Sequence, residues 1–291
     1  MKDIQNIIVS LFLMIGFNLS AQDKEFILEE IKNHDLPVLG VAFSPDGKYL
    51  ATCSEDKTTK IWNLDDFSEI ITLEGHFQEV NDVIFSQKGD KLITAGDRSI
   101  RIWNSETWAE EKVLTGHYTY VWSVNTNPAM TRLASGSFDK QPRLWDVKTG
   151  ESILLEGHDK SVLATAMSPD GSLVASGSLD EFIMLWDAKT HELLKTFEGH
   201  SDNIYEIKFT PDGEHFVSVS RDKTVRLWSI EQEGIVKTYP GHRAGVMTVD
   251  ISNDGNFMLT GSFDGEIKLW ELATSTEIYT FTQHEKAITG V

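Results

Sequence analysis

The chain has 291 residues, of which 45 are Asp or Glu and 26 are Lys or Arg, so its formal net charge is −19. This acidic balance argues against sequence-independent binding to nucleic acid or to anionic lipid. A hydrophobic content of 40% excludes wholesale disorder. The single cysteine, Cys53, excludes an internal disulfide and a cysteine-cluster zinc site.

The N-terminus, residues 1–21, has the pattern of a secretory signal peptide. Lys2 precedes an apolar run from Ile7 to Leu19, and Ser20 and Ala21 follow it. The run is shorter than the ~20 apolar residues that a membrane-spanning helix needs, and its flanks are typical of export. We expect cleavage after Ala21 and a secreted or periplasmic protein with no membrane insertion after that cleavage. A cytosolic protein with an apolar N-terminus is the alternative.

Four residue types recur in a fixed register along the rest of the chain, which indicates internal repeats. Successive His residues are 41 or 42 positions apart, a hydroxyl follows each by 18 positions, and an Asp precedes each Trp by six. The complete sets are His34, Thr52, Asp56 and Trp62; His76, Thr94, Asp97 and Trp103; His117, Ser135, Asp139 and Trp145; His158, Ser176, Asp180 and Trp186; His200, Ser218, Asp222 and Trp228; and His242, Thr260, Asp264 and Trp270.

Within one repeat the local pattern predicts four short strands. The run from Val162 to Met167 precedes a Ser-Pro-Asp-Gly turn, the run from Leu173 to Ser178 follows it, and a third strand ends at the Trp. A fourth strand precedes the next His. Four strands per ~42 residues, with no helical periodicity, are typical of a propeller blade. Because both faces of such a small sheet are apolar, the blades must stack.

The dipeptides at the repeat boundaries resemble those of the WD40 repeat family. Gly precedes five of the His residues (76, 117, 158, 200 and 242), and Trp-Asp occurs at 145–146 and 186–187. The resemblance implies an all-β WD40 β-propeller of four-stranded blades over residues 25–291. Its repeats span about 34–74, 76–115, 117–156, 158–198, 200–240 and 242–282.

A partial seventh repeat is expected at 284–291. Ala287 to Val291 has the pattern of an innermost strand, and Phe26 to Ile31 that of an outermost strand. We therefore expect six complete blades plus a partial seventh closed by the N-terminal strand, as in a C-terminally truncated copy of a seven-bladed ring. A six-bladed ring is the alternative.

A hydroxyl, an imidazole and a carboxylate also suggest a hydrolytic triad. The same set occurs once in every repeat, however, whereas an enzyme needs one activated nucleophile. The family resemblance implies instead a hydrogen-bonded tetrad that runs Trp, Ser or Thr, His, Asp inside each blade. We expect no catalytic, cofactor or metal residues, since there is no phosphate-binding glycine loop and no dinucleotide fingerprint.

The resemblance further implies partner contacts three and five residues after each His and just before each Asp. These positions hold many aromatic and apolar side chains, which is typical of a binding surface, although rings that merely fill the channel are the alternative. The expected contact residues are Glu55, Glu79, Asn81, Tyr120, Trp122, Phe138, Ser161, Leu163, Leu179, Asn203, Tyr205, Arg221, Met247 and Phe263.

These observations predict a non-catalytic scaffold that binds a protein or peptide, including partners with exposed Lys or Arg. We expect no binding to nucleic acid. Two alternatives stay open. In the first, the propeller is the sensing or docking part of a longer secreted enzyme whose catalytic domain lies beyond Val291. In the second, the propeller binds carbohydrate through its aromatic residues.

Overall fold

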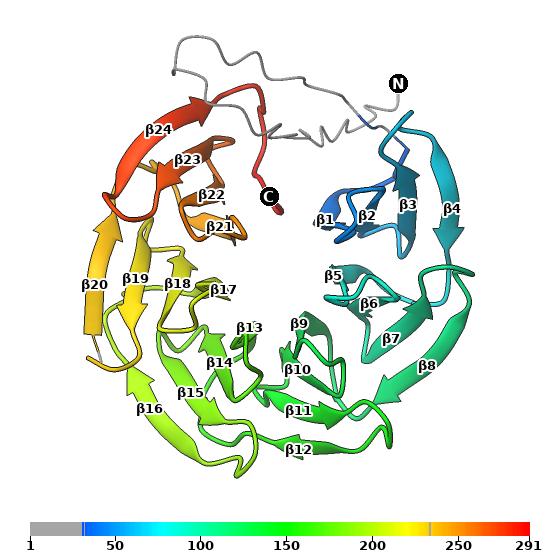
Figure 1. Cartoon of the computed structure of the whole chain (residues 1–291), viewed down its shortest axis with the longest axis horizontal. Coiled ribbons are helices and arrows are strands. Elements are labelled where there is room, and N and C mark those ends of the chain that lie inside the picture. Colours follow the sequence, from blue (N-terminus) through cyan, green and yellow to red (C-terminus); the bar gives the residue numbers. More distant parts are fainter. Residues whose placement is uncertain (1–30, 32, 233) are drawn as a thin grey trace.

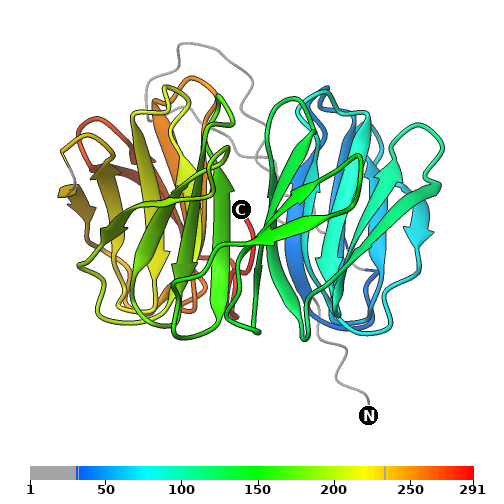
Figure 2. The same cartoon turned by 90° about the horizontal axis from the view of Figure 1, so that it is seen from below.

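The computed structural model describes residues 31, 33–232 and 234–291, and the regular elements in this part of the chain are 24 β-strands. They form six antiparallel sheets of four consecutive strands each. Figure 1 shows the sheets arranged as blades around a central opening, and Figure 2 shows the ring from its edge. The predicted all-β propeller with four-stranded blades is confirmed. In the described part of the chain, we find no helix with the length and hydropathy needed to cross a membrane.

The strands run from the channel outward in chain order within every blade. Blades one and two contain β1 (Val38–Phe43), β2 (Tyr49–Ser54), β3 (Thr59–Asn63), β4 (Glu69–Leu73), β5 (Val80–Phe85), β6 (Lys91–Gly96), β7 (Ser99–Asn104) and β8 (Glu110–Thr115). Blades three and four contain β9 (Val121–Thr126), β10 (Arg132–Ser137), β11 (Arg143–Asp146), β12 (Ser152–Leu154), β13 (Val162–Met167), β14 (Leu173–Ser178), β15 (Ile183–Asp187) and β16 (Leu193–Phe197). Blades five and six contain β17 (Ile204–Phe209), β18 (His215–Ser220), β19 (Val225–Ser229), β20 (Gly234–Tyr239), β21 (Val246–Ile251), β22 (Phe257–Ser262), β23 (Ile267–Glu271) and β24 (Thr276–Phe281).

The turn after each innermost strand explains why these strands are short. Between β13 and β14, the Asp170 carboxylate accepts hydrogen bonds from the Ser168 hydroxyl at 2.6 Å and from the Ser172 amide at 3.0 Å. Gly171 has a φ of 73° there, in the left-handed region that favours glycine. The chain therefore reverses after six residues and keeps each blade narrow.

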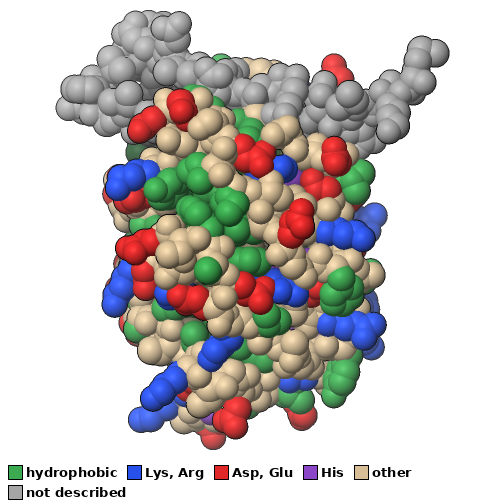
Figure 3. All heavy atoms as spheres, turned by 90° about the vertical axis from the view of Figure 1, so that its right-hand side faces the viewer, with side chains coloured by type: hydrophobic (Ala, Val, Ile, Leu, Met, Phe, Trp, Pro, Cys, Tyr) green, Lys and Arg blue, Asp and Glu red, His purple; other side chains and the backbone are tan. Residues whose placement is uncertain are grey.

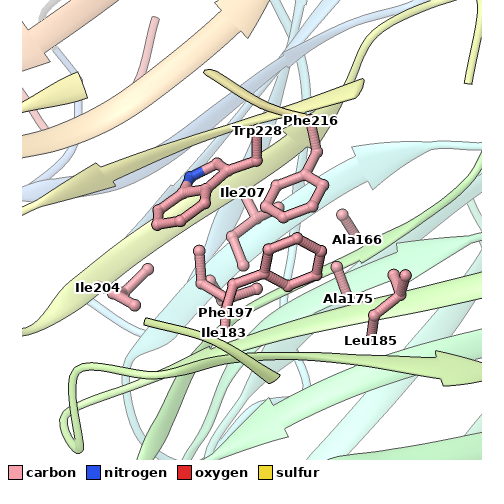
Figure 4. Close-up of a cluster of buried hydrophobic side chains, with 10 residues drawn as sticks. Ala166, Ala175, Ile183, Leu185, Phe197, Ile204, Ile207, Phe216 and Trp228 are labelled. Carbon is pink, nitrogen blue, oxygen red and sulfur yellow. The ribbon is translucent and has the colours of Figure 1, made fainter. Parts of the chain in front are cut away.

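The blades are held together by apolar side chains from facing sheets. Between blades four and five, the Phe197 ring lies edge-on to Phe216 and Trp228, at centroid distances of 5.1 and 5.7 Å (Figure 4). Ile204 and Ile207 of β17 complete this cluster with residues of blade four. Equivalent clusters join the other neighbouring blades, so the hydrophobic core is divided among the interfaces between blades.

Lysines of three outermost strands also link neighbouring blades. The Lys112 ammonium donates to the Val147 and Lys148 carbonyls of the next blade at 2.7 Å each. Lys195 and Lys237 reach equivalent carbonyls of the blades that follow them. These contacts satisfy carbonyl groups at the turns between the third and fourth strands.

The segment 284–291 runs between blade six and blade one (Figure 1). A methyl group on Gly261 would lie 2.4 Å from Ile288 Cγ2, and one on Gly177 would lie 2.6 Å from Ile204 Cγ2. Ile288 thus packs on blade six as Ile204 packs on blade four. The Ile288 amide donates to the Ser262 carbonyl at 3.0 Å, and the Thr289 hydroxyl donates to the Val38 carbonyl at 2.8 Å.

This segment is not a regular strand, in contrast to the expectation for Ala287 to Val291. The reason is that the Ile288 amide and the Thr289 hydroxyl bond to the two flanking blades, and no strand of the described residues pairs with the segment along its length. The expected signal peptide, residues 1–21, and residues 26–30 of the expected N-terminal strand lie outside the described residues. The partial seventh blade stays a prediction.

Candidate functional site

Each blade contains a chain of hydrogen bonds that starts at its Trp. The indole N–H donates to the Ser or Thr oxygen at 2.7–3.0 Å in all six blades. That hydroxyl lies 2.7–2.9 Å from His Nε2. In blades one, three, four and five, His Nδ1 lies 2.7–2.8 Å from the Asp carboxylate. A neutral imidazole with its proton on Nδ1 satisfies all of these contacts.

Blades two and six depart from this arrangement at the His–Asp contact. His76 Nδ1 lies 3.3 Å from Asp97 Oδ1, and His242 Nδ1 lies 3.5 Å from Asp264 Oδ2. Both Nδ1 atoms are buried without a hydrogen-bond partner among the described residues. Blade two has one residue fewer between its His and its Asp than the other blades, whereas blade six has no such deletion.

The tetrads are unsuited to catalysis because their hydroxyls are inaccessible. The Ser135 and Ser218 side chains, for example, belong to residues that are 0% exposed, and neither lines the channel. Each hydroxyl oxygen also accepts the Trp indole proton. A substrate therefore cannot reach these groups, and their repetition in every blade matches a structural role.

The electrostatics of the tetrads agree with neutral His and ionised Asp. Burial raises the pKa of Asp139, but the contacts with His117 and the hydrogen bonds from the Tyr118 and Gln141 amides together outweigh it and hold that pKa below its usual range. The same balance lowers the pKa of Asp222 beside His200. Burial lowers the pKa of His117 and of His200 below the ordinary value of 6.5, although their Asp partners oppose this shift.

The tetrad Asp also ties together two loops at one end of each blade. Its carboxylate accepts the backbone N–H of the residue after the His, as Asp139 does from Tyr118 at 3.0 Å and Asp180 does from Asp159 at 3.0 Å. The loops that enter the innermost strands and the turns between second and third strands therefore lie on one side of the ring. We call this side the top face.

Five aromatic side chains form two groups on the top face and at the mouth of the channel. The Phe138 ring lies edge-on to Tyr120 and Trp122, at centroid distances of 6.3 and 5.3 Å. Across the ring, Tyr205 of blade five lies edge-on to Phe263 of blade six at 5.8 Å. Phe138 and Phe263 are 37% and 44% exposed. We call these five residues the aromatic rim.

The expected contact residues divide into two sets in the structure. Those five positions after the His line a central channel of about 1000 Å³, namely Asn81, Trp122, Leu163, Tyr205 and Met247. Asn81 and Leu163 are buried, so for these two the expected exposure to solvent on the face is wrong. The remaining expected residues lie outside the channel lining; Glu55, Phe138, Arg221 and Phe263 are exposed, and Glu79, Tyr120, Ser161, Leu179 and Asn203 are half-buried.

The channel wall carries charged side chains from the innermost strands. Lys208 Nζ lies 3.5 Å from Glu206 Oε1 and 3.8 Å from Asp250 Oδ1. The Asp82 carboxylate of β5 accepts the Val124 amide of β9 at 2.8 Å. Desolvation raises the pKa of Asp82 above its usual range despite that hydrogen bond. With three carboxyl groups and one ammonium, the channel wall favours cationic over anionic groups.

Two exposed aromatic residues of the top face were not expected from the sequence. Phe77 and Tyr118 are 59% and 72% exposed. Each directly follows the His of its repeat, so the repeat register would have located them if this position had been included. The channel-lining Leu39 of blade one was also missed, although it stands five positions after His34.

The side of the ring differs from the top face in its mixture of side chains. Figure 3 shows acidic and basic side chains interspersed with hydrophobic ones on one side of the molecule. Apolar residues of the outermost strands, such as Leu194 of β16 and Val236 of β20, are exposed singly or in pairs at 47% and 42%. Such scattered exposure is ordinary for a protein surface.

Comparison with known proteins gives the same repeat register as the fold. The family profile described as "WD domain, G-beta repeat" matches residues 26–63, 67–104, 108–146, 151–187, 191–229 and 234–271. The chain belongs to the WD40 repeat family. Each matched WD40 stretch ends at the last residue of a third strand (β3, β7, β11, β15, β19 or β23), and the five stretches after the first run from an outermost strand to the third strand of the next blade.

Several curated WD40 relatives match parts of the propeller. A U4/U6 small nuclear ribonucleoprotein PRP4-like protein of Arabidopsis thaliana is 44% identical over 62 residues, which is 21% of this chain and 11% of that protein. The non-functional target of rapamycin complex subunit LST8-2 of the same plant is 44% identical over 64 residues, 22% of this chain and 20% of that protein. The general transcriptional corepressor TUP1 of Saccharomyces cerevisiae is 44% identical over 46 residues, which is 16% of this chain and 6% of that protein. The matches thus span a fifth or less of these relatives.

Proposed function

We propose that this WD40 propeller is a non-catalytic scaffold that binds a protein or peptide partner at the aromatic rim and the channel mouth beneath it. The observation that carries the proposal is the aromatic rim itself, with Phe138 and Phe263 exposed and Trp122 and Tyr205 lining the channel. Exposed aromatic side chains beside a concave opening are typical anchors for a partner.

The names of these three relatives agree with a role in assemblies. One is a complex subunit, one a corepressor and one a ribonucleoprotein protein. The inaccessible hydroxyls of the tetrads support a role without catalysis. Neither observation identifies a partner, so the proposal is confined to the surface and to the chemistry that the surface favours.

The charges near the aromatic rim favour a partner with exposed Lys or Arg side chains. Glu55 and Glu79 lie on the top face, and Glu206 and Asp250 lie on the channel wall. Such carboxylates attract cationic partners and lower the affinity for anionic ones, and the attraction falls with increasing salt. The net charge of −19 acts in the same direction.

Binding of selected peptides tests this surface. We would select peptides from a random display library on the purified full chain and measure their affinity by fluorescence anisotropy. We expect peptides with Lys or Arg, and about 30-fold weaker binding after Trp122→Ala or Tyr205→Ala, the loss of a strong anchor of about 2 kcal/mol. Phe43→Ala is the control, because Phe43 is 45% exposed and lines the channel at the C-terminal end of β1, away from the top face.

Equal affinity for the parent, Trp122→Ala and Tyr205→Ala, with all three folded, would contradict the proposed surface. A parallel glycan array addresses the carbohydrate alternative, since aromatic rings also stack on sugars. Glycan binding that is lost in the same two variants, without peptide binding, would overturn the peptide proposal.

We also propose that the protein acts outside the cytoplasm after removal of residues 1–21. The support is the basic start, the apolar run from Ile7 to Leu19 and the small Ala21. Expression of the full sequence in a secreting host, followed by N-terminal sequencing, checks this. We expect a mature chain that begins at Gln22 in the exported fraction; an intact N-terminus in the cytoplasmic fraction would be the opposite result.

A further inference from the structure

Blade six differs from the other blades at the position two residues after the tetrad Asp. Blades one to five have Thr58, Ser99, Gln141, Phe182 and Thr224 at this position, and blade six has Glu266. The Thr58 hydroxyl donates to Asp56 at 2.6 Å and lies 3.4 Å from His34 Nδ1. Thr224 makes the same contacts with Asp222 and His200, at 2.6 and 3.3 Å. Blade six therefore has a carboxylate where blades one, two and five have a small hydroxyl.

In this environment, one nitrogen of the buried His242 imidazole lacks a hydrogen-bond partner among the described residues. Its side chain is 1% exposed, and Nδ1 has no hydrogen-bond partner among the described residues. Its other nitrogen, Nε2, lies 2.8 Å from the Thr260 oxygen. A buried polar atom without a partner is costly, so its occurrence beside two carboxylates points to a ligand that bonds to all three groups.

The spacing of these groups is that of metal ligands. One ring nitrogen of His242 and one carboxylate oxygen each of Asp264 and Glu266 all lie within 4.8 Å of one another. Two ligands on a tetrahedral ion with bonds of ~2.1 Å are ~3.4 Å apart. The 3.5 Å between His242 Nδ1 and Asp264 Oδ2 is close to that separation and too long for a good hydrogen bond.

The local charge is also suitable for a divalent cation. Asp264, Glu266 and Glu277 supply three carboxylates, and Lys268 supplies one ammonium, 3.0 Å from Glu277 Oε2 and 3.4 Å from Glu266 Oε2. The Asp264 and Glu266 side chains are only 11% and 16% exposed. Two carboxylate charges in excess, in a largely desolvated place, would be balanced by one M²⁺ ion.

We propose that His242 Nδ1, Asp264 and Glu266 bind a zinc ion, with water completing its coordination. Nitrogen together with carboxylate oxygen suits Zn²⁺, whereas Ca²⁺ and Mg²⁺ prefer oxygen alone. The neutral imidazole carries its proton on Nε2 in this state and donates it to Thr260. The Arg243 and Glu266 amides, at 2.8 and 2.9 Å from Asp264 oxygens, hold that carboxylate in place. The ion joins the loop before β21 to the turn between β22 and β23.

Calorimetric titration of Zn²⁺ into the chelator-treated, tag-free full chain tests the site. We expect one saturable site, and at least tenfold weaker binding in Glu266→Thr. This variant places in blade six the residue that blades one and five have, so it removes the ligand and keeps the tetrad. Zinc should raise the Tm of the parent and leave that of Glu266→Thr unchanged. Substituted Co²⁺ should show the visible band of a tetrahedral site only in the parent.

A matched control is available in blade five, where Asp212, Glu214 and His215 form the other group of three metal-ligating side chains among the described residues. Asp212 and Glu214 are exposed. Glu214→Gln should leave zinc binding unchanged. The proposal is overturned if the parent shows no saturable zinc binding, if Glu266→Thr binds zinc as tightly as the parent, or if Glu214→Gln abolishes the binding. Ca²⁺ that competes with Zn²⁺ at equal concentration would also contradict it.

Discussion

Trp228→Ala is expected to lower the free energy of unfolding by about 3–5 kcal/mol, the usual range for removal of a large aromatic side chain from a core. Trp228 is 1% exposed and packs on Phe197 and Phe216 between blades four and five (Figure 4). Its indole N–H donates to Ser218 at 2.7 Å, so the substitution also removes one partner of a buried hydroxyl. Both losses act at the same interface between blades.

Urea unfolding followed by circular dichroism measures this effect, with Trp122→Ala as the control. Trp122 is half-buried at the channel mouth, and its removal leaves the interfaces between blades intact. We expect the control to cost about 1 kcal/mol or less, as for residues away from the core. Similar losses in the two variants would show that the tetrad Trp residues do not hold the blades together.

Acidification from pH 7.5 to pH 5.5 is expected to destabilise the propeller. Burial lowers the pKa of His117 and His200 in the folded state below 6.5. Above pH 6.5 these two groups are neutral in the folded and in the unfolded state, so they do not lower the free energy of unfolding. As the pH falls through 6.5, the unfolded state binds protons that the folded state does not, and each group costs up to about 1.4 kcal/mol per pH unit.

At lower pH, protonation of the tetrad carboxylates lowers the free energy of unfolding further. Burial raises the pKa values of Asp139 and Asp222, but the contacts with His117 and His200, together with hydrogen bonds from nearby groups, outweigh it and lower both values in the folded state. Their contribution is complete above the ordinary pKa of 3.8 and disappears as the pH falls through the folded value. Urea unfolding at several pH values checks both steps. Stability that is equal or higher at pH 5.5 than at pH 7.5 would contradict the neutral, buried state of the imidazoles.

The strands were predictable because each repeat presents the same local signals. The runs Val162 to Met167 and Leu173 to Ser178 coincide with β13 and β14. The Pro and Gly of the intervening turn terminate the first run, and the register of the Trp sets the third strand. The same local signals recur six times, so the six complete four-stranded blades could be predicted from the sequence.

Two features of the site depend on contacts between segments that local patterns do not encode. Asn81 and Leu163 stand at positions expected to face solvent, but both are buried at the channel wall, where the Asn81 amide donates to the Val121 carbonyl of the next blade at 2.9 Å. The repeat register does not reveal that His242 Nδ1 lies 3.5 Å from Asp264 or that Glu266 joins these two side chains in one cluster.

The differences among the blades explain how a repeated scaffold acquires one particular surface. All six blades share the tetrad, which sets the position of the top-face loops. The residues beside the tetrad differ freely, with Phe138 before one Asp, Arg221 before another and Phe263 before a third. The aromatic rim is therefore a property of these variable positions, carried by a constant framework.

The most direct test of the account is the ¹⁵N and ¹H NMR signature of the tetrad imidazoles during a pH titration. We predict slowly exchanging Nδ1 protons for His34, His117, His158 and His200, because each of these Nδ1 atoms lies 2.7–2.8 Å from its Asp. His117 and His200 should stay neutral when the pH falls below 6.5. Nδ1 protons that exchange rapidly with solvent in all four rings, together with titration of His117 and His200 near pH 6.5 in the folded protein, would contradict the buried, structural tetrads on which the fold and the proposed binding surface depend.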